Sequence, residues 1–582
     1  MSLAQDLRFG SRMLLRNPGF AIVAVLTLAL GIGANTAIFS YVDGVLLKPL
    51  PYEHPERICM VWEKPPGGDR NGISTLNYLD WASQNTVFDH MAARRGDSMT
   101  LSGSGEPVQL RAAQVSAGFF GIFGVRAALG RTFVQGEDQL GKPRVVVLSH
   151  RLWKNRFGEA RGVIGRKIIL NSQPYEVVGV LPADSPYDRG YSEIWTPLVF
   201  EPKDMTRNFH WFISYARLKE GVTLQQAQAE MKVIGARIEK LYPDSNKGWS
   251  VRVDRFTDQV VGDQLRNSLY VLLAAVGAVL LIGCANLANL TLARGTARER
   301  EVAIRASLGA GRWRLMRQFL TENVLLALAG GALGLALGFG MVLGLKALTP
   351  PFMLPSEANV HVDMRVLLFT LAISVFTGIF FGLAPALQAA RPDLAGSMKE
   401  GGRGSTTGGT RRRLRSALVV AETALAFVLL TGAGLLIRSF DELQSVNTGF
   451  DSTNVLTMSV PLSPTKFREG EQAVLFLRQV TSSVEALPGI REAAVTSSLP
   501  LQGWGYGMPF QIVGKPVKDR ANREACFFKM VSDSYFRSLG INLRRGRGFS
   551  ERDVKGTPPV TVINETMAKK YFKGQNPIGQ RI

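Results

Sequence analysis

A glycine-containing stretch in the first half of the chain comes close to a nucleotide-binding motif. Residues 136–143, GEDQLGKP, have the spacing of a phosphate-binding loop up to its last position, where the motif needs a Ser or Thr hydroxyl for magnesium. Pro143 occupies that position. We therefore expect a surface loop here, and we predict no cofactor-binding residue in the chain.

Other signatures of catalysis and metal binding are absent from the sequence. The five histidines form no HExxH motif, and there is no GxSxG turn for a nucleophilic serine. Cys59, Cys284 and Cys526 are far apart in the chain and have no metal-ligand spacing. The sequence thus predicts neither a catalytic residue nor a metal ligand, which argues against an enzyme.

A charged segment in the middle of the chain carries the strongest functional signal. Thr296 and Glu299 form a T-x-x-E box, in which the two side-chain oxygens accept hydrogen bonds from the free amides of a helix start. A short helix is predicted to begin there and to end at the glycines within 309–311, since glycine readily takes the left-handed cap conformation. The residues that this helix would present are Arg298, Glu299, Arg300, Glu301, Ile304 and Arg305.

Long apolar stretches surround this segment, consistent with a hydrophobic content of 46%. A helix needs about 20 residues to cross a bilayer. The stretches of that length are 20–47, 269–292, 324–348, 366–390 and 414–440. The first has an apolar run longer than the roughly 7–15 residues of a cleavable signal, so we expect it to remain as an anchor.

The distribution of Lys and Arg predicts the orientation of these spans. Basic residues cluster in 1–19, 293–319 and 391–413, whereas the loop 350–363 contains none. Short loops rich in Lys and Arg stay in the cytosol. The three basic segments are therefore predicted to be cytosolic, and the loop 350–363 is predicted to lie on the opposite side of the membrane. Much of the net charge of +21 is then topological, and no nucleic-acid partner is expected.

The same alternation places 48–268 and 441–582 outside the cytosol. The first of these parts shows period-two apolar runs at 145–148 and 175–180, and a helical pattern at 224–241 after a Gly-Val-Thr start. That mixture predicts an α+β domain. Segment 391–413 contains GGRGSTTGG, a composition typical of a flexible linker.

The N-terminal segment 1–19 has an amphipathic pattern. Leu3, Leu7 and Leu14 share one side of a helix, and three arginines, Arg8, Arg12 and Arg16, share the other. This pattern predicts a helix that lies in the membrane interface, in contact with lipid, and braces the first span. A plain basic tail that sets topology is an equally good interpretation.

Small and polar residues within the spans suggest how the helices pack. Gly330, Gly334 and Gly338 have the small-xxx-small spacing that permits close helix approach. The polar residues in apolar surroundings are Asn286, Asn289 and Glu422. They could form a proton or substrate path, but interhelical hydrogen bonding near the cytosolic end is the favoured interpretation.

An internal repeat indicates a duplicated unit. Residues 115–133 and 531–549 are identical at seven of nineteen positions at a constant offset of 416. The similarity continues to Ile168 and Ile582, after which the second copy stops, so we expect 441–582 to be an incomplete domain and the chain a fragment. An intact protein of about 804 residues is expected on that basis.

The motif-level resemblance is to MacB/FtsX-type ABC transporter permeases. Residues 297–335 resemble the FtsX-like permease core, and residues 15–40, with the repeat, resemble the anchor and the periplasmic core domain of MacB. The closest pattern is the duplicated form called the acidobacterial-type duplicated orphan permease. The resemblance implies α-helical transmembrane spans plus α+β periplasmic domains, internally duplicated, and makes the segment after the second span a coupling helix for a separate cytosolic ATPase.

The implied function is mechanotransmission, in which ATP hydrolysis by that partner moves the spans and the periplasmic domains for efflux or periplasmic export. The implied location is the bacterial inner membrane with a cytosolic N-terminus, with room for a periplasmic adaptor or outer-membrane partner. Alternatives are a scaffold that regulates a periplasmic cell-wall hydrolase and a membrane-anchored sensor. Impermeant thiol reagents are expected to reach Cys59 and Cys526, but not Cys284.

Overall fold

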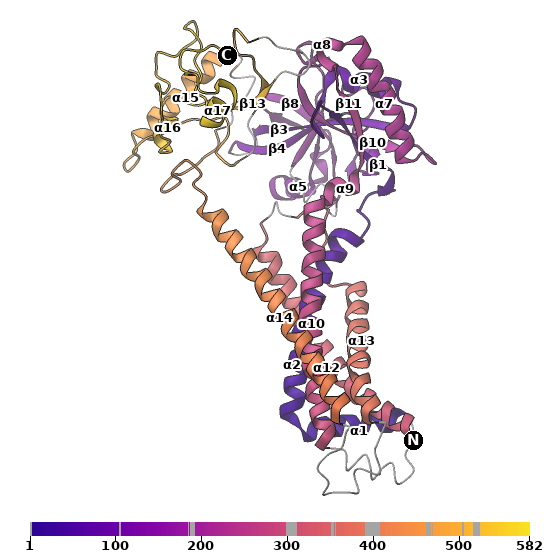
Figure 1. Cartoon of the computed structure of the whole chain (residues 1–582). Helices are drawn as coiled ribbons and strands as arrows, with labels where there is room; N and C mark the ends of the chain where they lie inside the picture. The colour runs from indigo at the N-terminus through magenta and orange to yellow at the C-terminus, as the bar shows by residue number, and fades with distance from the viewer. Residues whose placement is uncertain are drawn as a thin grey trace. The chain divides into compact units, whose positions relative to one another are not determined.

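The chain folds into two compact units, each made of two separate stretches of sequence (Figure 1). The first unit comprises Met1–Leu50 and Val260–Ser445, and the second comprises Pro51–Gln259 and Val446–Ile582. The computed structural model describes residues 3–103, 106–183, 185–186, 192–297, 311–350, 354–355, 357–389, 408–460, 462, 467, 470–502, 506–515 and 524–582.

The first unit is helical. Its helices are α1 (Leu3–Arg16), α2 (Pro18–Val42), α10 (Asp263–Ala297), α12 (Arg312–Leu348), α13 (Met364–Ala389) and α14 (Gly408–Ser445). A π-helical turn, η1 (Asp43–Leu47), extends α2. Helix α14 already begins at Gly408, so the last residues of the predicted linker 391–413 are helical. The arginines in this part of the chain favour a helix, because arginine is a good helix former.

Four helices in the described part of the chain are long and apolar enough to cross a membrane. They are Pro18–Leu47, Asp263–Thr291, Trp313–Leu348 and Ser416–Ser445, which match four of the five predicted stretches. The fifth stretch, 366–390, falls in α13, a helix of 26 residues with an apolar part at Met364–Phe380. The chain is therefore a multi-pass membrane protein.

The core of the helical unit lies where α2, α10 and α12 meet (Figure 1). Leu28 and Ile32 of α2 pack against Cys284 of α10 and Leu326 of α12, and all four side chains are buried. The apolar stretch of α14, in contrast, contains no fully buried residue.

Helix α1 packs on α12 through its apolar side. A Cβ atom added at Gly10 would lie 2.9 Å from Leu325 Cδ1, and Leu14 packs against the core of the unit. The three arginines of α1 are exposed. The brace predicted for the first span therefore contacts α12 as well as α2.

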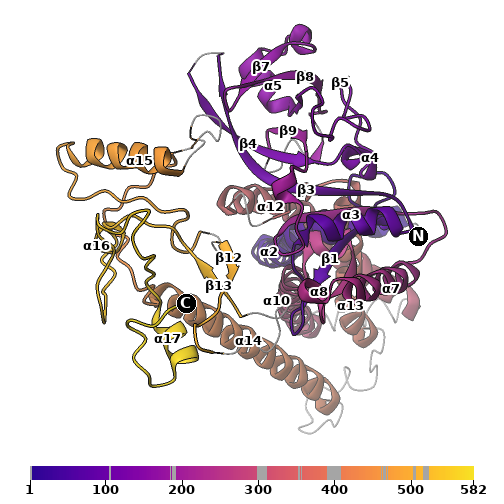
Figure 2. The ribbon, with the colours of Figure 1, turned by 90° about the horizontal axis from the view of Figure 1, so that it is seen from above.

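The second unit contains an eleven-stranded mixed sheet. The strands are β1 (Ile58–Lys64), β2 (Ile73–Ser74), β3 (Phe88–Ser102), β4 (Val108–Val115), β5 (Leu129–Gly130), β6 (Val145–Leu148), β7 (Lys167–Leu170), β8 (Gln173–Val180), β9 (Ile194–Pro197), β10 (His210–Leu218) and β11 (Ser250–Arg255). The main order is β11-β1-β10-β3-β4-β9-β6-β8-β5, with β2 on β10 and β7 between β3 and β8. Figure 2 shows β5, β7 and β8 toward one end of this sheet and β1 toward the other.

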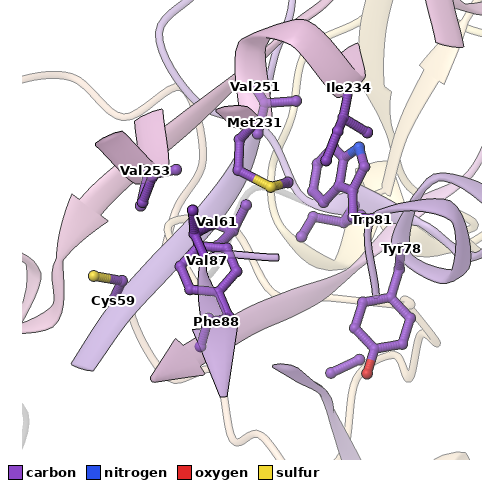
Figure 3. Packing of buried hydrophobic residues seen from close by; sticks show 14 of the residues in the cluster. Cys59, Val61, Tyr78, Trp81, Val87, Phe88, Met231, Ile234, Val251 and Val253 are labelled. Atoms are coloured by element: carbon purple, nitrogen blue, oxygen red, sulfur yellow. The ribbon is translucent and has the colours of Figure 1, made fainter. Parts of the chain in front are cut away.

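Two hydrophobic cores support this sheet. At one end, Trp81 from α3 (Thr75–Gln84) and Met231 from α7 (Leu224–Leu241) pack with Val61 and Phe88 of the sheet (Figure 3). At the other end, Leu152 of α5 (His150–Phe157) packs on β6 and β8. The predictions of strands at 145–148 and 175–180 and of a helix at 224–241 are confirmed, and the domain is α+β.

Thr223 begins α7 with a reciprocal capping box. Its Oγ1 accepts a hydrogen bond from the backbone N–H of Gln226, and the Gln226 side chain accepts one from the backbone N–H of Thr223. Two amides that the helix leaves free are thereby satisfied, which explains why the helix starts directly after the Gly-Val-Thr sequence.

The two copies of the repeat share side-chain geometry as well as sequence. Arg131 pairs with Glu137 at 2.7 Å, and Arg547 pairs with Asp553 at 2.7 Å, the same positions at the offset of 416. Gly130 and Gly546 both have a positive φ, at 73° and 78°. Because similar pairs hold the same turn in both copies, the structure agrees with a duplication.

The helices of the two copies correspond in the same way. Helix α5 is capped by Ser149, whose side chain accepts from Leu152 N. Helix α17 (Glu565–Phe572) is capped by Asn564, whose side chain accepts from Met567 N. Ser and Asn are both strong N-cap residues, so the helix start is retained although the residue differs.

The cysteines correct one expectation. Cys59 lies in β1 with a fully buried side chain, as Cys284 does in α10, whereas Cys526 is half-buried. Burial raises the pKa of Cys59 to about 12, and the thiolate is the form that reacts with thiol reagents. The expectation that reagents reach Cys59 from outside is therefore wrong for the folded protein.

An impermeant maleimide is expected to label Cys526 alone in the folded protein, and all three thiols after denaturation. The measurement is the mass of labelled peptides with and without denaturant, with Cys526→Ser as the control that loses native labelling. Rapid native labelling of Cys284 would contradict the packing of α10 against α2.

Candidate functional site

The glycines predicted for helix packing lie at the contact of α12 with α2. A Cβ atom added at Gly334 or Gly338 would stand 3.0 Å from a backbone carbonyl O of α2, that of Gly33 in the case of Gly338. At Gly330 an added Cβ would meet the Leu28 side chain at 2.6 Å. The absence of side chains at these three positions therefore sets the distance between the two backbones.

Polar side chains also join the helices of this bundle. Thr36 Oγ1 of α2 lies 3.0 Å from Thr370 Oγ1 of α13, and both residues are buried. Asn35 Nδ2 donates to the carbonyl O of Val276 in α10 at 2.8 Å. Sequence reasoning missed these residues; the available signal was the polar group Asn35, Thr36 and Ser40 within an otherwise apolar run.

The polar residues that the sequence did single out are placed differently. Asn286 is exposed on α10 and Glu422 is half-buried on α14. Asn289 is half-buried, and its Oδ1 atom has no hydrogen-bond partner among the described residues. Interhelical hydrogen bonding by these three side chains is thus not observed in the described part of the chain, and their role stays a prediction.

The predicted coupling segment joins α10 to α12. Thr296 lies inside α10, one residue before its end, so it is a helical residue and not the extended N-cap that the T-x-x-E box requires. Its predicted neighbours lie in 298–310, outside the described residues: Arg298, Glu299, Arg300, Glu301, Ile304 and Arg305. Helix α12 resumes at Arg312, directly after Gly311.

The loop that resembles a phosphate-binding motif has a structural role. The Glu137 carboxylate accepts hydrogen bonds from the guanidinium of Arg131 and from the backbone N–H of Val134. Asp138 Oδ2 accepts a hydrogen bond from Ala117 N at 3.0 Å. The carboxylates of this loop are therefore engaged with their own domain, as expected for a surface loop.

The second copy shows the electrostatic consequence of the same turn. Two hydrogen bonds from the Arg547 guanidinium, together with the Ser550 amide, lower the pKa of Asp553 below its ordinary value. The carboxylate is thus ionised, and the turn remains paired, throughout the physiological pH range.

A buried carboxylate and an imidazole lie together in the α+β domain. Glu63 Oε2 is 2.5 Å from His210 Nδ1, and Glu63 is 1% exposed. The other oxygen of Glu63 accepts hydrogen bonds from Ser74 N and from Asn77 Nδ2. The burial of Glu63 and its contacts with β2, α3 and β10 indicate that it fixes these three elements to β1.

Within the described residues, no group of three or more His, Cys, Asp and Glu side chains is placed to bind a metal ion. The candidate functional features are the tightly packed bundle, the segment between α10 and α12, and the domains that follow α2 and α14 in the chain.

Two family models match the chain. The MacB-like periplasmic core domain matches residues 21–234 and 416–582, and the FtsX-like permease C-terminal domain matches residues 273–394. The first match falls twice on the chain and covers both copies of the repeat. The second covers α12, α13, most of α10 and the segment between α10 and α12.

The chain is also similar to individual proteins that are named as ABC transporter permeases. The macrolide export ATP-binding/permease protein MacB of Chromobacterium violaceum is 28% identical over 379 residues, 63% of this chain and 56% of that protein. The uncharacterized ABC transporter permease YknZ of Bacillus subtilis is 24% identical over 410 residues, 68% of this chain and 98% of that protein. The chain spans about half the length of the curated MacB proteins it matches.

A solved structure, the periplasmic region of MacB from Actinobacillus actinomycetemcomitans, covers 38% of this chain and 95% of its own length. Its TM-score is 0.28 and its sequence identity is 13%.

Proposed function

This chain belongs to the family of the MacB-like periplasmic core domain, and from that premise we propose that it is the permease subunit of a MacB/FtsX-type ABC transporter. The observation that supports this most directly is that one chain carries both the duplicated periplasmic core and the FtsX-like permease region. Among the named forms of this family, the acidobacterial-type duplicated orphan permease fits that arrangement best.

The proposed mechanism is mechanotransmission. A separate cytosolic ATPase binds the segment 293–319, and ATP binding and hydrolysis move α10 and α12, and α2 with them. The close contact of Gly334 and Gly338 with α2 supports this mechanism, because helices packed backbone to backbone move together. Helix α2 continues in the chain into the first outer domain, which would carry the motion outward.

The proposed location is the bacterial inner membrane, with the N-terminus and the segments 293–319 and 391–413 in the cytosol. The exposed arginines of α1 fit that side, since basic residues are retained there and attract anionic head groups. The outer domains would act on a molecule already in the periplasm or outer leaflet for efflux or export, together with an adaptor or outer-membrane partner where one exists.

Co-expression with candidate ABC ATPase subunits from the same organism tests the proposal. The two chains are expected to co-purify in detergent, and ATP hydrolysis by the partner is expected to rise on reconstitution with this chain. Failure to bind any such subunit would count against the proposal and favour an anchored sensor. Capture of a cell-wall hydrolase by the outer domains would favour the scaffold alternative.

A further inference from the structure

A cluster of charged residues lies where α2 ends and α13 begins. Lys48 Nζ lies 2.8 Å from Asp363 Oδ2 and 3.5 Å from Asp43 Oδ2. Arg365 Nη1 lies 3.7 Å from the other oxygen of Asp43. His361 completes the group, with Nε2 3.5 Å from Lys48 Nζ. Residues more than 300 positions apart in the sequence are thus joined within one unit.

Asp43 is the buried centre of this cluster. Its side chain is 2% exposed, and its Oδ2 atom has no hydrogen-bond donor among the described residues. A carboxylate in such surroundings depends on nearby cations, because burial strongly disfavours an isolated charge. Lys48 and Arg365 are the two cations that the ion-pair distances place beside it.

The backbone is shaped to bring these groups together. Asp43–Leu47 forms a π-helical turn that is closed by a hydrogen bond from Lys48 N to the carbonyl O of Asp43 at 2.8 Å. A Cβ atom added at Gly44 would lie 2.9 Å from the carbonyl O of Asn359, so the two segments touch through their backbones. Single π-turns within α-helices occur often at functional positions.

Asp363 also begins α13. Its Oδ1 atom accepts hydrogen bonds from the backbone N–H groups of Arg365 and Val366, as an N-cap carboxylate does. The Lys48 ammonium, with these amides, lowers the pKa of Asp363 to about 2. The stabilisation by the Asp363 carboxylate is present above its ordinary pKa of about 4 and is lost only as the pH falls toward 2, so the Lys48–Asp363 pair persists at physiological pH.

We infer that four residues form a charged clamp: Asp43, Lys48, Asp363 and Arg365. The clamp fixes the end of α2 to the start of α13. It thereby holds in place the residues that connect α2 to the first outer domain. A loose helix end would absorb the movement of the bundle, whereas a clamped end transmits it. The clamp itself is argued from contacts within the bundle; its role in transmission rests on the proposed function.

Hydrogen exchange of the full chain in nanodiscs tests the clamp. Lys48→Met is expected to speed exchange of 43–50 and 359–366 on the order of tenfold or more, because it leaves Asp43 buried without its nearest cation. Adding Asp43→Asn to Lys48→Met should restore only part of the protection, since the unpaired buried charge is removed but the Lys48–Asp363 ion pair is still missing. Lys346→Met, on an exposed lysine in the last turn of α12, is the matched control and should change neither segment.

A second arm tests transmission with the ATPase partner present. In the wild type, exchange in the first outer domain should change when nucleotide is added; in Lys48→Met that change should be lost while the partner remains bound. Unchanged exchange at 43–50 in Lys48→Met would overturn the clamp. Faster exchange there with an intact nucleotide response would overturn its transmitting role, and a wild type without any nucleotide response would instead count against the proposed function.

Discussion

Gly334→Leu is expected to leave little correctly folded protein, with a loss of stability of about 3 kcal/mol or more. An added Cβ at this position would stand 3.0 Å from a carbonyl O of α2 and 3.1 Å from the backbone N of Gly33, and neither backbone atom can turn aside as a side chain could. The two helices would have to separate and open the core at Leu28 and Ile32. Thermal unfolding in detergent, followed together with the yield of monodisperse protein, measures this effect.

Gly340→Leu is the matched control for that substitution. Gly340 lies on the same helix, and an added Cβ there would meet nothing within 4 Å. The same side chain should therefore be tolerated at Gly340, since leucine is also a better helix former than glycine. Equal melting temperatures of the Gly334 and Gly340 variants would show that the close contact of α12 with α2 does not hold the bundle together.

The double substitution Glu299→Lys with Glu301→Lys is expected to abolish stimulation of the ATPase partner and its co-purification. It reverses the charge of the predicted coupling segment, while membrane insertion should survive because added cytosolic positive charge agrees with the orientation. Ile304→Pro should have the same effect, since a proline inside a helix costs about 3 kcal/mol. The measurements are ATP hydrolysis on reconstitution and the amount of partner retained on the purified chain.

Arg300→Lys provides the control in the same segment, because it keeps the charge and should leave both measurements unchanged. If the double glutamate variant and Ile304→Pro both bind and stimulate the partner normally, segment 293–319 serves orientation alone. Misfolding of a variant would be separated from loss of coupling by the native protection of Cys59 and Cys284 from labelling, because both thiols are buried in the folded protein.

Local pattern sufficed to predict some elements and not others. The helix at 224–241 and the strand at 145–148 were predictable because a cap and a compact apolar run lie within the segment itself. Strand β1 was not, because it is buried on both faces and shows no alternation, and for the same reason the burial of Cys59 was missed. The parallel pairing of β4 with β9 depends on contacts about 80 residues apart, which no local pattern carries.

In the helical bundle, too, some features could be predicted from the sequence and others could not. Glycine spacing within α12 could be recognised in one segment, so Gly330, Gly334 and Gly338 were identified in advance. The pairs Thr36–Thr370 and Lys48–Asp363 each need two segments whose proximity only the fold supplies. Polar residues in apolar runs were a usable signal, but the sequence alone could not distinguish Asn35, which donates to α10, from Asn286, which is exposed.

The turn shared by Arg131 with Glu137 and Arg547 with Asp553 has a consequence for how this protein can evolve. In a homodimer, one mutation in the gene alters both subunits at once, so every change must suit two symmetric positions. Here the two copies are encoded separately within one gene, and one has Glu where the other has Asp. Each copy can therefore acquire its own substitutions. A mutation in one copy does not change the other, so the two copies need not keep identical residues at equivalent positions.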